Sequence, residues 1–124
     1  MNNILIIVGA AVIILWGIAH LIPTRNIVNG FGEISADNRK IIAMESMAEG
    51  VTLIFLGVLP LLVNLIADEP GQVASIVYLA CALMLLVMAG LTLSTGARTP
   101  TIWYKVCPAV KTVAAVLFIL GNVL

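Results

Sequence analysis

The stretch Ile41–Ile66, IIAMESMAEGVTLIFLGVLPLLVNLI, is an almost continuous apolar run that contains two glutamates, Glu45 and Glu49. It is long enough for a helix to cross a bilayer, which needs about 20 residues. Three further apolar runs have similar lengths: Ile4–Ile22, Val73–Thr95 and Ile102–Leu124. We therefore predict an all-α integral membrane bundle of four transmembrane helices, arranged up-down-up-down, in a single four-helix transmembrane domain over residues 1–124.

Composition supports this class. Of the 124 residues, 62% are hydrophobic and only 10% are charged, whereas soluble domains carry roughly 25% charged residues. The formal net charge is zero, which argues against a nucleic-acid partner, because such a partner requires a surplus of basic residues. The lipid bilayer is the partner that we predict.

The cationic residues lie on one side of the predicted bundle. The connection between the second and third runs carries only Asp68 and Glu69, whereas all six Lys and Arg residues belong to the other side: Arg25, Arg39, Lys40, Arg98, Lys105 and Lys111. The positive-inside rule assigns that side to the cytoplasm. We therefore expect a multi-pass protein of the cell (inner/plasma) membrane with both termini outside. Trp103 and Tyr104 fit an interfacial aromatic belt on the cytoplasmic side.

The first connection is long, and its apolar residues Ile27, Val28, Phe31 and Ile34 recur at helical spacing. This pattern predicts a short segment that lies on the membrane surface. We expect Asp37 or Asn38 to cap the second span.

The two glutamates lie four residues apart, so both carboxyl groups share one helix face. From the helix rise, Glu45 lies about 6 Å and Glu49 about 12 Å inside the hydrocarbon boundary, Lys111 about 12 Å, and His20 about 5 Å. Arg25 and Arg39 stand just above that layer. Because charged groups within a membrane usually face a bundle interior or a cavity, we predict a polar pocket in the cytoplasmic leaflet. Its candidate residues are His20, Glu45, Glu49, Lys111, Arg25 and Arg39.

This constellation has two interpretations. In the structural one, Glu49 and Lys111 form a buried ion pair, and Glu45 binds His20, Arg25 or Arg39 or reaches the interface. In the functional one, the pocket serves proton-coupled transport, acid–base chemistry on an amphiphilic substrate, or binding of a lipid or quinone headgroup.

The motifs of common enzyme classes are missing from the sequence. There is no nucleophile–base motif, P-loop or zinc signature. The glutamates form Glu-x-x-x-Glu rather than the Glu-x-x-His of four-helix metal sites. We therefore expect no metal and no cofactor, and the sequence assigns no catalytic residue.

Three features of the chain resemble DoxX-type small membrane proteins. These are the pair Glu49-Gly50 early in the second span, the run Leu56–Leu62 that follows it, and Pro108 shortly before Lys111 in the fourth span. The resemblance implies a four-span fold and an association with membrane redox complexes, and it transfers no catalytic residue.

We therefore expect a small polytopic protein that is a non-catalytic accessory or assembly subunit. We also expect it to act as a homo-oligomer or within a larger membrane complex. The alternatives are a proton-coupled small-solute transporter and a membrane enzyme that acts on a lipid- or quinone-like substrate.

Overall fold

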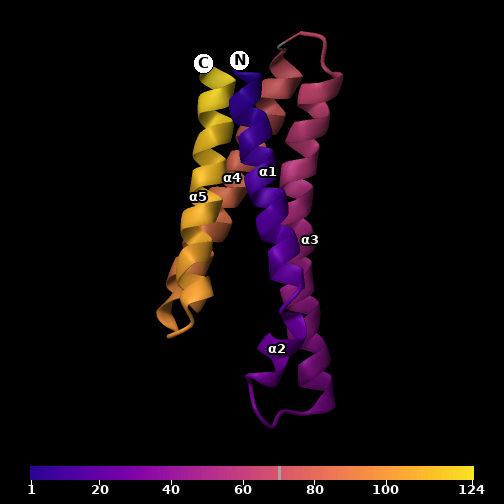
Figure 1. Ribbon diagram of the computed structural model, residues 1–124, viewed down its shortest axis with the longest axis vertical. Coiled ribbons are helices and arrows are strands. Elements are labelled where there is room, and N and C mark those ends of the chain that lie inside the picture. The colour runs from indigo at the N-terminus through magenta and orange to yellow at the C-terminus, as the bar shows by residue number, and fades with distance from the viewer. Residues whose placement is uncertain (70) are drawn as a thin grey trace.

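The computed structural model describes residues 1–69 and 71–124, and Figure 1 shows them as a bundle of helices. Over these residues there is no β-strand. The elements are α1 (Asn3–Leu21), α2 (Thr24–Asn29), α3 (Ala36–Ile66), α4 (Gln72–Ser94), the 3-10 turn η1 (Gly96–Arg98) and α5 (Ile102–Val123). Four of these helices, α1, α3, α4 and α5, are long and apolar enough to cross a membrane. The chain is a small multi-pass membrane protein.

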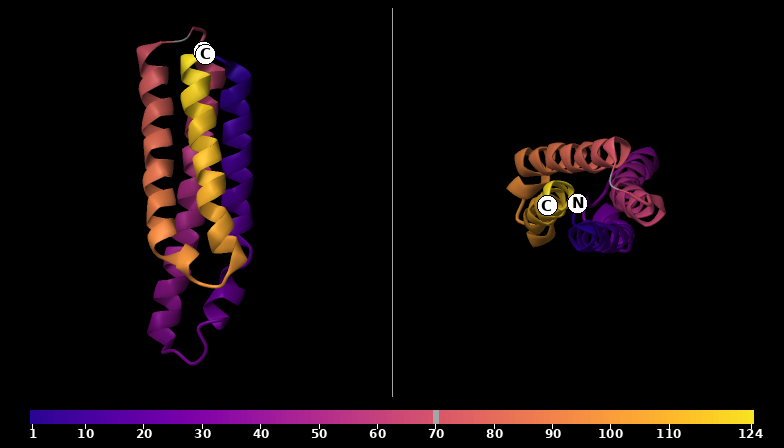
Figure 2. Two further views of the ribbon diagram at one scale, coloured as in Figure 1. Left: turned by 90° about the vertical axis from the view of Figure 1, so that its left-hand side faces the viewer. Right: turned by 90° about the horizontal axis from the view of Figure 1, so that it is seen from above.

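The four long helices alternate in direction. α1 packs against α3 and α5, and α4 packs against α5 and α3 (Figures 1 and 2). Both termini lie at one end of the bundle together with the turn between α3 and α4, while α2 and η1 lie at the opposite end. The predicted all-α, up-down-up-down bundle of four helices is confirmed.

Two helix starts show how local sequence sets the boundaries. The Asn2 side chain caps α1 by accepting hydrogen bonds from the backbone N–H groups of Ile4 and Leu5. Ser35 caps α3 by accepting from the N–H of Asn38 at 3.1 Å. The prediction that Asp37 or Asn38 provides this cap was therefore wrong. α3 begins at Ala36 rather than at Ile41, because a serine with extended backbone satisfies the free N–H groups of the first turn.

The first connection contains only a short helix. α2 includes Ile27 and Val28, and Val28 is buried, whereas Phe31 and Ile34 follow in the loop. Gly32 has φ +74°, a left-handed conformation that glycine adopts without steric cost. The helical spacing of apolar residues in the sequence therefore extends past Asn29, where α2 has already ended.

Glycines allow α1 to approach its two neighbours closely. A Cβ atom on Gly57 of α3 would lie 2.5 Å from Ile14 Cγ1 and 2.9 Å from the Ala10 carbonyl oxygen. A Cβ atom on Gly121 of α5 would lie 2.7 Å from Ile6 Cδ1. Such small residues are typical of close helix contacts in membranes, where dispersion contacts and not water exclusion hold helices together.

The bundle opens toward the end that carries α2 and η1. There the hairpin of α4 and α5 diverges from the hairpin of α1 and α3 (Figure 1). Two cavities lie between the hairpins at this end, and residues of both hairpins line each cavity. The divergence therefore positions the candidate site.

Candidate functional site

An ionic network joins all four long helices where the hairpins begin to diverge. Glu49 of α3 accepts a hydrogen bond from Lys111 Nζ of α5 through Oε1. Its other oxygen, Oε2, lies 3.2 Å from His20 Nε2 of α1. Lys111 also donates to Thr92 Oγ1 of α4 at 3.0 Å. One carboxylate is thus the common partner of a lysine and a histidine from two other helices.

The members of this network differ in burial. The Lys111 side chain is fully buried, that of His20 is 10% exposed, and that of Glu49 is 30% exposed. A fully buried ammonium group is stable only when a carboxylate and further acceptors satisfy it. Glu49 and Thr92 are these acceptors, so the network first of all stabilises the lysine.

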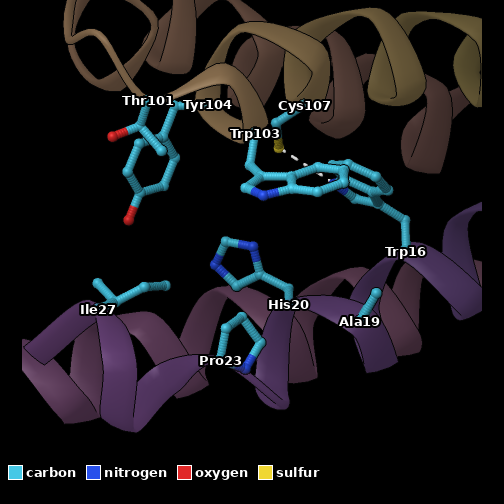
Figure 3. Close-up of a pocket in the computed structure, with 9 residues that line it drawn as sticks. All are labelled: Trp16, Ala19, His20, Pro23, Ile27, Thr101, Trp103, Tyr104 and Cys107. Carbon is cyan, nitrogen blue, oxygen red and sulfur yellow. Dashed lines mark hydrogen bonds between the residues drawn. The ribbon is translucent and has the colours of Figure 1, made fainter.

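The first cavity lies between α1 and α5, encloses about 260 Å³, and is called the aromatic cavity below (Figure 3). Its walls are mostly apolar or aromatic: Trp16, Ala19, His20, Pro23, Ile27, Thr101, Trp103, Tyr104 and Cys107. The indole rings of Trp16 and Trp103 are 6.5 Å apart between centroids and inclined at 52°. Trp16 Nε1 donates to Cys107 Sγ at 3.2 Å, which anchors one indole to α5.

The second cavity encloses about 480 Å³ and is called the polar cavity. Its polar lining includes the carboxylates of Glu45 and Glu49 and five hydroxyl side chains, those of Ser46, Thr52, Thr92, Thr95 and Tyr104, among apolar residues. The hydroxyl oxygen of Ser46 is buried and has no hydrogen-bond partner among the described residues. Buried hydroxyl groups are normally paired, so the hydrogen-bonding capacity of Ser46 is unused within the described part of the chain.

The two cavities share His20, Ile27 and Tyr104, and together they form what we call the cleft. In Figure 3 the His20 ring lies between the indole rings and Pro23. Its Nε2 atom faces Glu49. The cleft therefore has an apolar compartment and a polar compartment, with a histidine at their boundary.

The structure distributes the six predicted pocket residues over two places. It joins His20, Glu49 and Lys111 directly. Glu45 lines the polar cavity but is exposed, and no ion pair to it occurs among the described residues.

Arg25 and Arg39 lie outside the cleft, in a separate groove that also includes Lys40. Arg39 donates to Asn29 Oδ1 at 3.0 Å and to the Gly32 carbonyl oxygen at 3.5 Å. The two arginines differ from the expectation because depth along a helix does not specify direction around it. They point away from the cleft toward the other side of α2.

Sequence reasoning did not select several residues of the cleft. Trp103 and Tyr104 were assigned to an interfacial belt, yet both line the aromatic cavity. Trp16, Thr92 and Cys107 were not selected at all. The sequence did carry a signal for Thr92, because a hydroxyl group inside a membrane helix needs a hydrogen-bond acceptor or donor nearby. In the structure, Thr92 accepts from Lys111 and donates to the Met88 carbonyl oxygen at 2.9 Å.

Within residues 1–69 and 71–124, no group of three or more His, Cys, Asp or Glu side chains is arranged to hold a metal ion. No family model, curated protein or solved structure matches the chain. The geometry of the cleft is therefore the basis for assigning a function.

Proposed function

We propose that this small membrane protein is a DoxX-like, non-catalytic accessory subunit that holds an amphiphilic, lipid- or quinone-like molecule in its cleft. The observation that carries this proposal is the division of the cleft into two compartments. An apolar compartment walled by Trp16 and Trp103 adjoins a polar one that contains Glu45 and Glu49, with His20 and Tyr104 belonging to both.

The dimensions and lining suit such a ligand. Small-molecule sites enclose roughly 300–1,000 Å³ and combine apolar walls with a few polar groups. A ring or alkyl tail fits against the indoles, because aromatic side chains stack on flat or apolar groups. A headgroup then reaches the hydroxyl and carboxylate groups of the polar cavity. Tyr104, which lines both cavities, provides the hydroxyl group that we expect to contact it.

The network supports a holding role rather than catalysis. Lys111 is fully buried and bonded to Glu49 and Thr92, and His20 lies against the same carboxylate. These groups hold one another in place, which keeps the part of the cleft wall that they form in a fixed geometry. In this role the protein acts within a larger membrane complex or as a homo-oligomer. It uses the cleft to retain a ligand for its partner.

We further propose that the cleft opens to the cytoplasmic leaflet and that both termini lie outside. All six Lys and Arg residues lie toward the end of the bundle that contains the cleft: they belong to α2, the beginning of α3, η1 or the first half of α5. The positive-inside rule assigns this end to the cytoplasm. A reporter fused after Leu124 tests this topology. We expect activity from a periplasmic or extracellular reporter, whereas a cytoplasmic signal would overturn the orientation.

Tryptophan fluorescence tests the binding proposal directly. The chain has two tryptophans, and both line the aromatic cavity, so emission reports its occupancy. In lipid nanodiscs, titration with a short-tailed benzoquinone and, separately, with a short-chain phospholipid should give saturable quenching or a spectral shift for one of them. If neither probe gives a saturable change, the proposal fails.

A pair of matched variants locates the binding. Ala19 lines the aromatic cavity, whereas Ala11 is exposed on the same helix and does not line the cleft. Ala19→Phe fills the cavity, and we expect it to weaken binding at least about tenfold, which corresponds to about 1.4 kcal/mol. Ala11→Phe should bind as the wild type does. Equal binding by the two variants would exclude the aromatic cavity as the site.

One observation favours a second candidate, proton-coupled transport. Glu49 is partly exposed to the polar cavity while it contacts His20, which places a carboxylate and an imidazole in one chain of proton acceptors. Glu49→Gln separates the two functions. An accessory subunit should lose stability or partner binding, whereas a transporter should stay folded and lose proton-dependent flux in proteoliposomes.

A further inference from the structure

A second hollow lies on the opposite side of α2 from the cleft. It is a groove of about 640 Å³ between α2, the end of α1 and the beginning of α3. Ile27 and Phe31 line the cleft, whereas Arg25 and Asn29 line the groove. Since α2 separates the two, the groove is independent of the ligand proposed above.

The groove concentrates positive charge. Three of the six Lys and Arg residues of the chain, namely Arg25, Arg39 and Lys40, line it. No carboxylate belongs to its lining, and none of the three cations forms an ion pair among the described residues. The contrast with Lys111 is direct, since that lysine is already neutralised by Glu49. The groove therefore presents an uncompensated positive surface.

Arg39 is held in place from the side of α2. Its guanidinium donates from Nη1 to Asn29 Oδ1 at 3.0 Å and from Nη2 to the Gly32 carbonyl oxygen at 3.5 Å. A guanidinium has five N–H donors in a planar fork, so other donors remain for an anion. An arginine whose position is fixed before binding loses less conformational freedom when it binds phosphate.

The floor of the groove is apolar. Leu21, Ile22 and Val28 line it beside the cations, and Ile22 is 79% exposed. Ile22 ends the first apolar run, and Lys40 directly precedes the second. The groove therefore lies at the boundary between hydrocarbon and water, where a phosphate group and the start of an acyl chain meet.

We propose that this groove binds an anionic phospholipid, with the phosphate on Arg25, Arg39 and Lys40 and an acyl chain along Leu21 and Ile22. Charge complementarity selects the ligand, because basic pockets at the cytoplasmic ends of membrane helices attract anionic headgroups. The apolar floor selects a lipid over a free anion.

Native mass spectrometry of the purified protein in detergent tests the proposal, with phosphatidylglycerol and phosphatidylcholine as alternative probes. We expect the wild type to retain one phosphatidylglycerol more tightly than phosphatidylcholine. The variant Arg25→Gln/Lys40→Gln should weaken phosphatidylglycerol binding about 25-fold, since each interfacial cation contributes roughly fivefold. It leaves the Arg39 contacts to Asn29 and Gly32 intact, so α2 keeps its position.

The matched control is Arg98→Gln/Lys105→Gln, which removes the same charge from exposed positions on the connection between α4 and α5 and at the start of α5. We expect this control to bind phosphatidylglycerol as the wild type does. Equal losses in the two double variants would mean general electrostatic attraction and would overturn the groove as a site. No loss in either would overturn it as well.

Inorganic phosphate alone distinguishes the two sources of the anion. If phosphate displaces phosphatidylglycerol from the wild type at concentrations comparable to those of the lipid, the groove binds free phosphate, and the lipid assignment is overturned. Circular dichroism of each variant should match the wild type, so that lost binding reflects the groove. Failure of the fluorescence test in the cleft leaves these expectations unchanged, because no lining residue is shared between the groove and the cleft.

Discussion

The two ends of this bundle are held together by different means. At the end with the termini, backbone and small residues are in direct contact: the Asn2 N–H donates to the Gly121 carbonyl oxygen at 2.7 Å, and Gly9 packs against Phe118. At the other end, a long side chain joins the two hairpins, since Lys111 of α5 reaches Glu49 of α3. Close helix packing needs small residues, whereas long side chains can join helices that have already separated.

This difference explains where the cleft lies. On α4, a Cβ atom on Gly90 would have no atom within 4 Å, so this glycine does not bring α4 close to another helix. Lys111 is fully buried, and its ammonium group reaches Glu49 across the space between the hairpins. The hairpins therefore remain connected while the cavities between them stay open. Substitutions in the close-packed region and in the region joined by long side chains should therefore change stability in different ways.

Lys111→Met removes the ammonium group and leaves Glu49 without its closest counter-charge. We expect the free energy of unfolding to fall by about 3–5 kcal/mol, as is typical when one partner of a buried ion pair is removed. Reversible unfolding in mixed micelles, followed by near-ultraviolet circular dichroism of the tryptophans, measures it. The double variant Lys111→Met/Glu49→Gln should recover most of the loss.

Lys105→Met is the control for that substitution, since Lys105 is exposed on the same helix. Its effect should stay within about 0.5 kcal/mol, as for most surface substitutions. If Lys111→Met proves as stable as Lys105→Met, the ionic network does not hold the hairpins together.

Gly57→Ala tests the close-packed region. The new methyl group would lie 2.5 Å from Ile14 Cγ1, 2.7 Å from Ile13 Cγ2 and 2.9 Å from the Ala10 carbonyl oxygen. Because one of these atoms belongs to the backbone of α1, the helices must separate, and we expect a loss of about 1–3 kcal/mol in unfolding free energy. The same unfolding assay measures it.

Gly90→Ala is the counterpart, since its new methyl group meets no atom within 4 Å. It should leave stability unchanged or raise it by up to about 1 kcal/mol, because alanine favours the helix. Equal destabilisation by the two alanines would contradict the contrast between close-packed and open regions.

His20→Phe should give the smallest loss among the three destabilising variants. It removes the contact between His20 Nε2 and Glu49 Oε2 at 3.2 Å but keeps the lysine partner of that carboxylate. We expect a loss of about 1.5 kcal/mol, the lower range for a hydrogen bond to a charged group. His20→Gln, which can still donate, should restore part of it. A loss as large as that of Lys111→Met would make His20 and Lys111 equal partners.

The sequence predicted the fold well because bilayer thickness imposes a length that can be read from apolar runs. The start of α3 was missed because Ala36–Lys40 is polar, so the apolar run begins only after Ser35 has already capped the helix. Boundaries outside the hydrocarbon depend on capping rather than on hydropathy.

For the site, the helix rise predicted that His20, Glu49 and Lys111 share a layer, and the structure joins these three. It could not predict that Arg25 and Arg39 face another groove, because the direction of a side chain around its helix depends on how the helices pack. The aromatic cavity was missed for the same reason. Its two indoles come from helices far apart in the sequence, and only the packing of α1 beside α5 brings them to one space.

The hydrogen bond from Asn2 to Gly121 also has a topological consequence. It places the first and last turns of the chain side by side at one end of the bundle, as in proteins that tolerate circular permutation. A short linker can therefore join the two ends, and new termini can be opened in the connection before α3 without reversing any helix. Two copies can equally be fused in tandem, since the end of one copy and the start of the next emerge on the same side of the membrane.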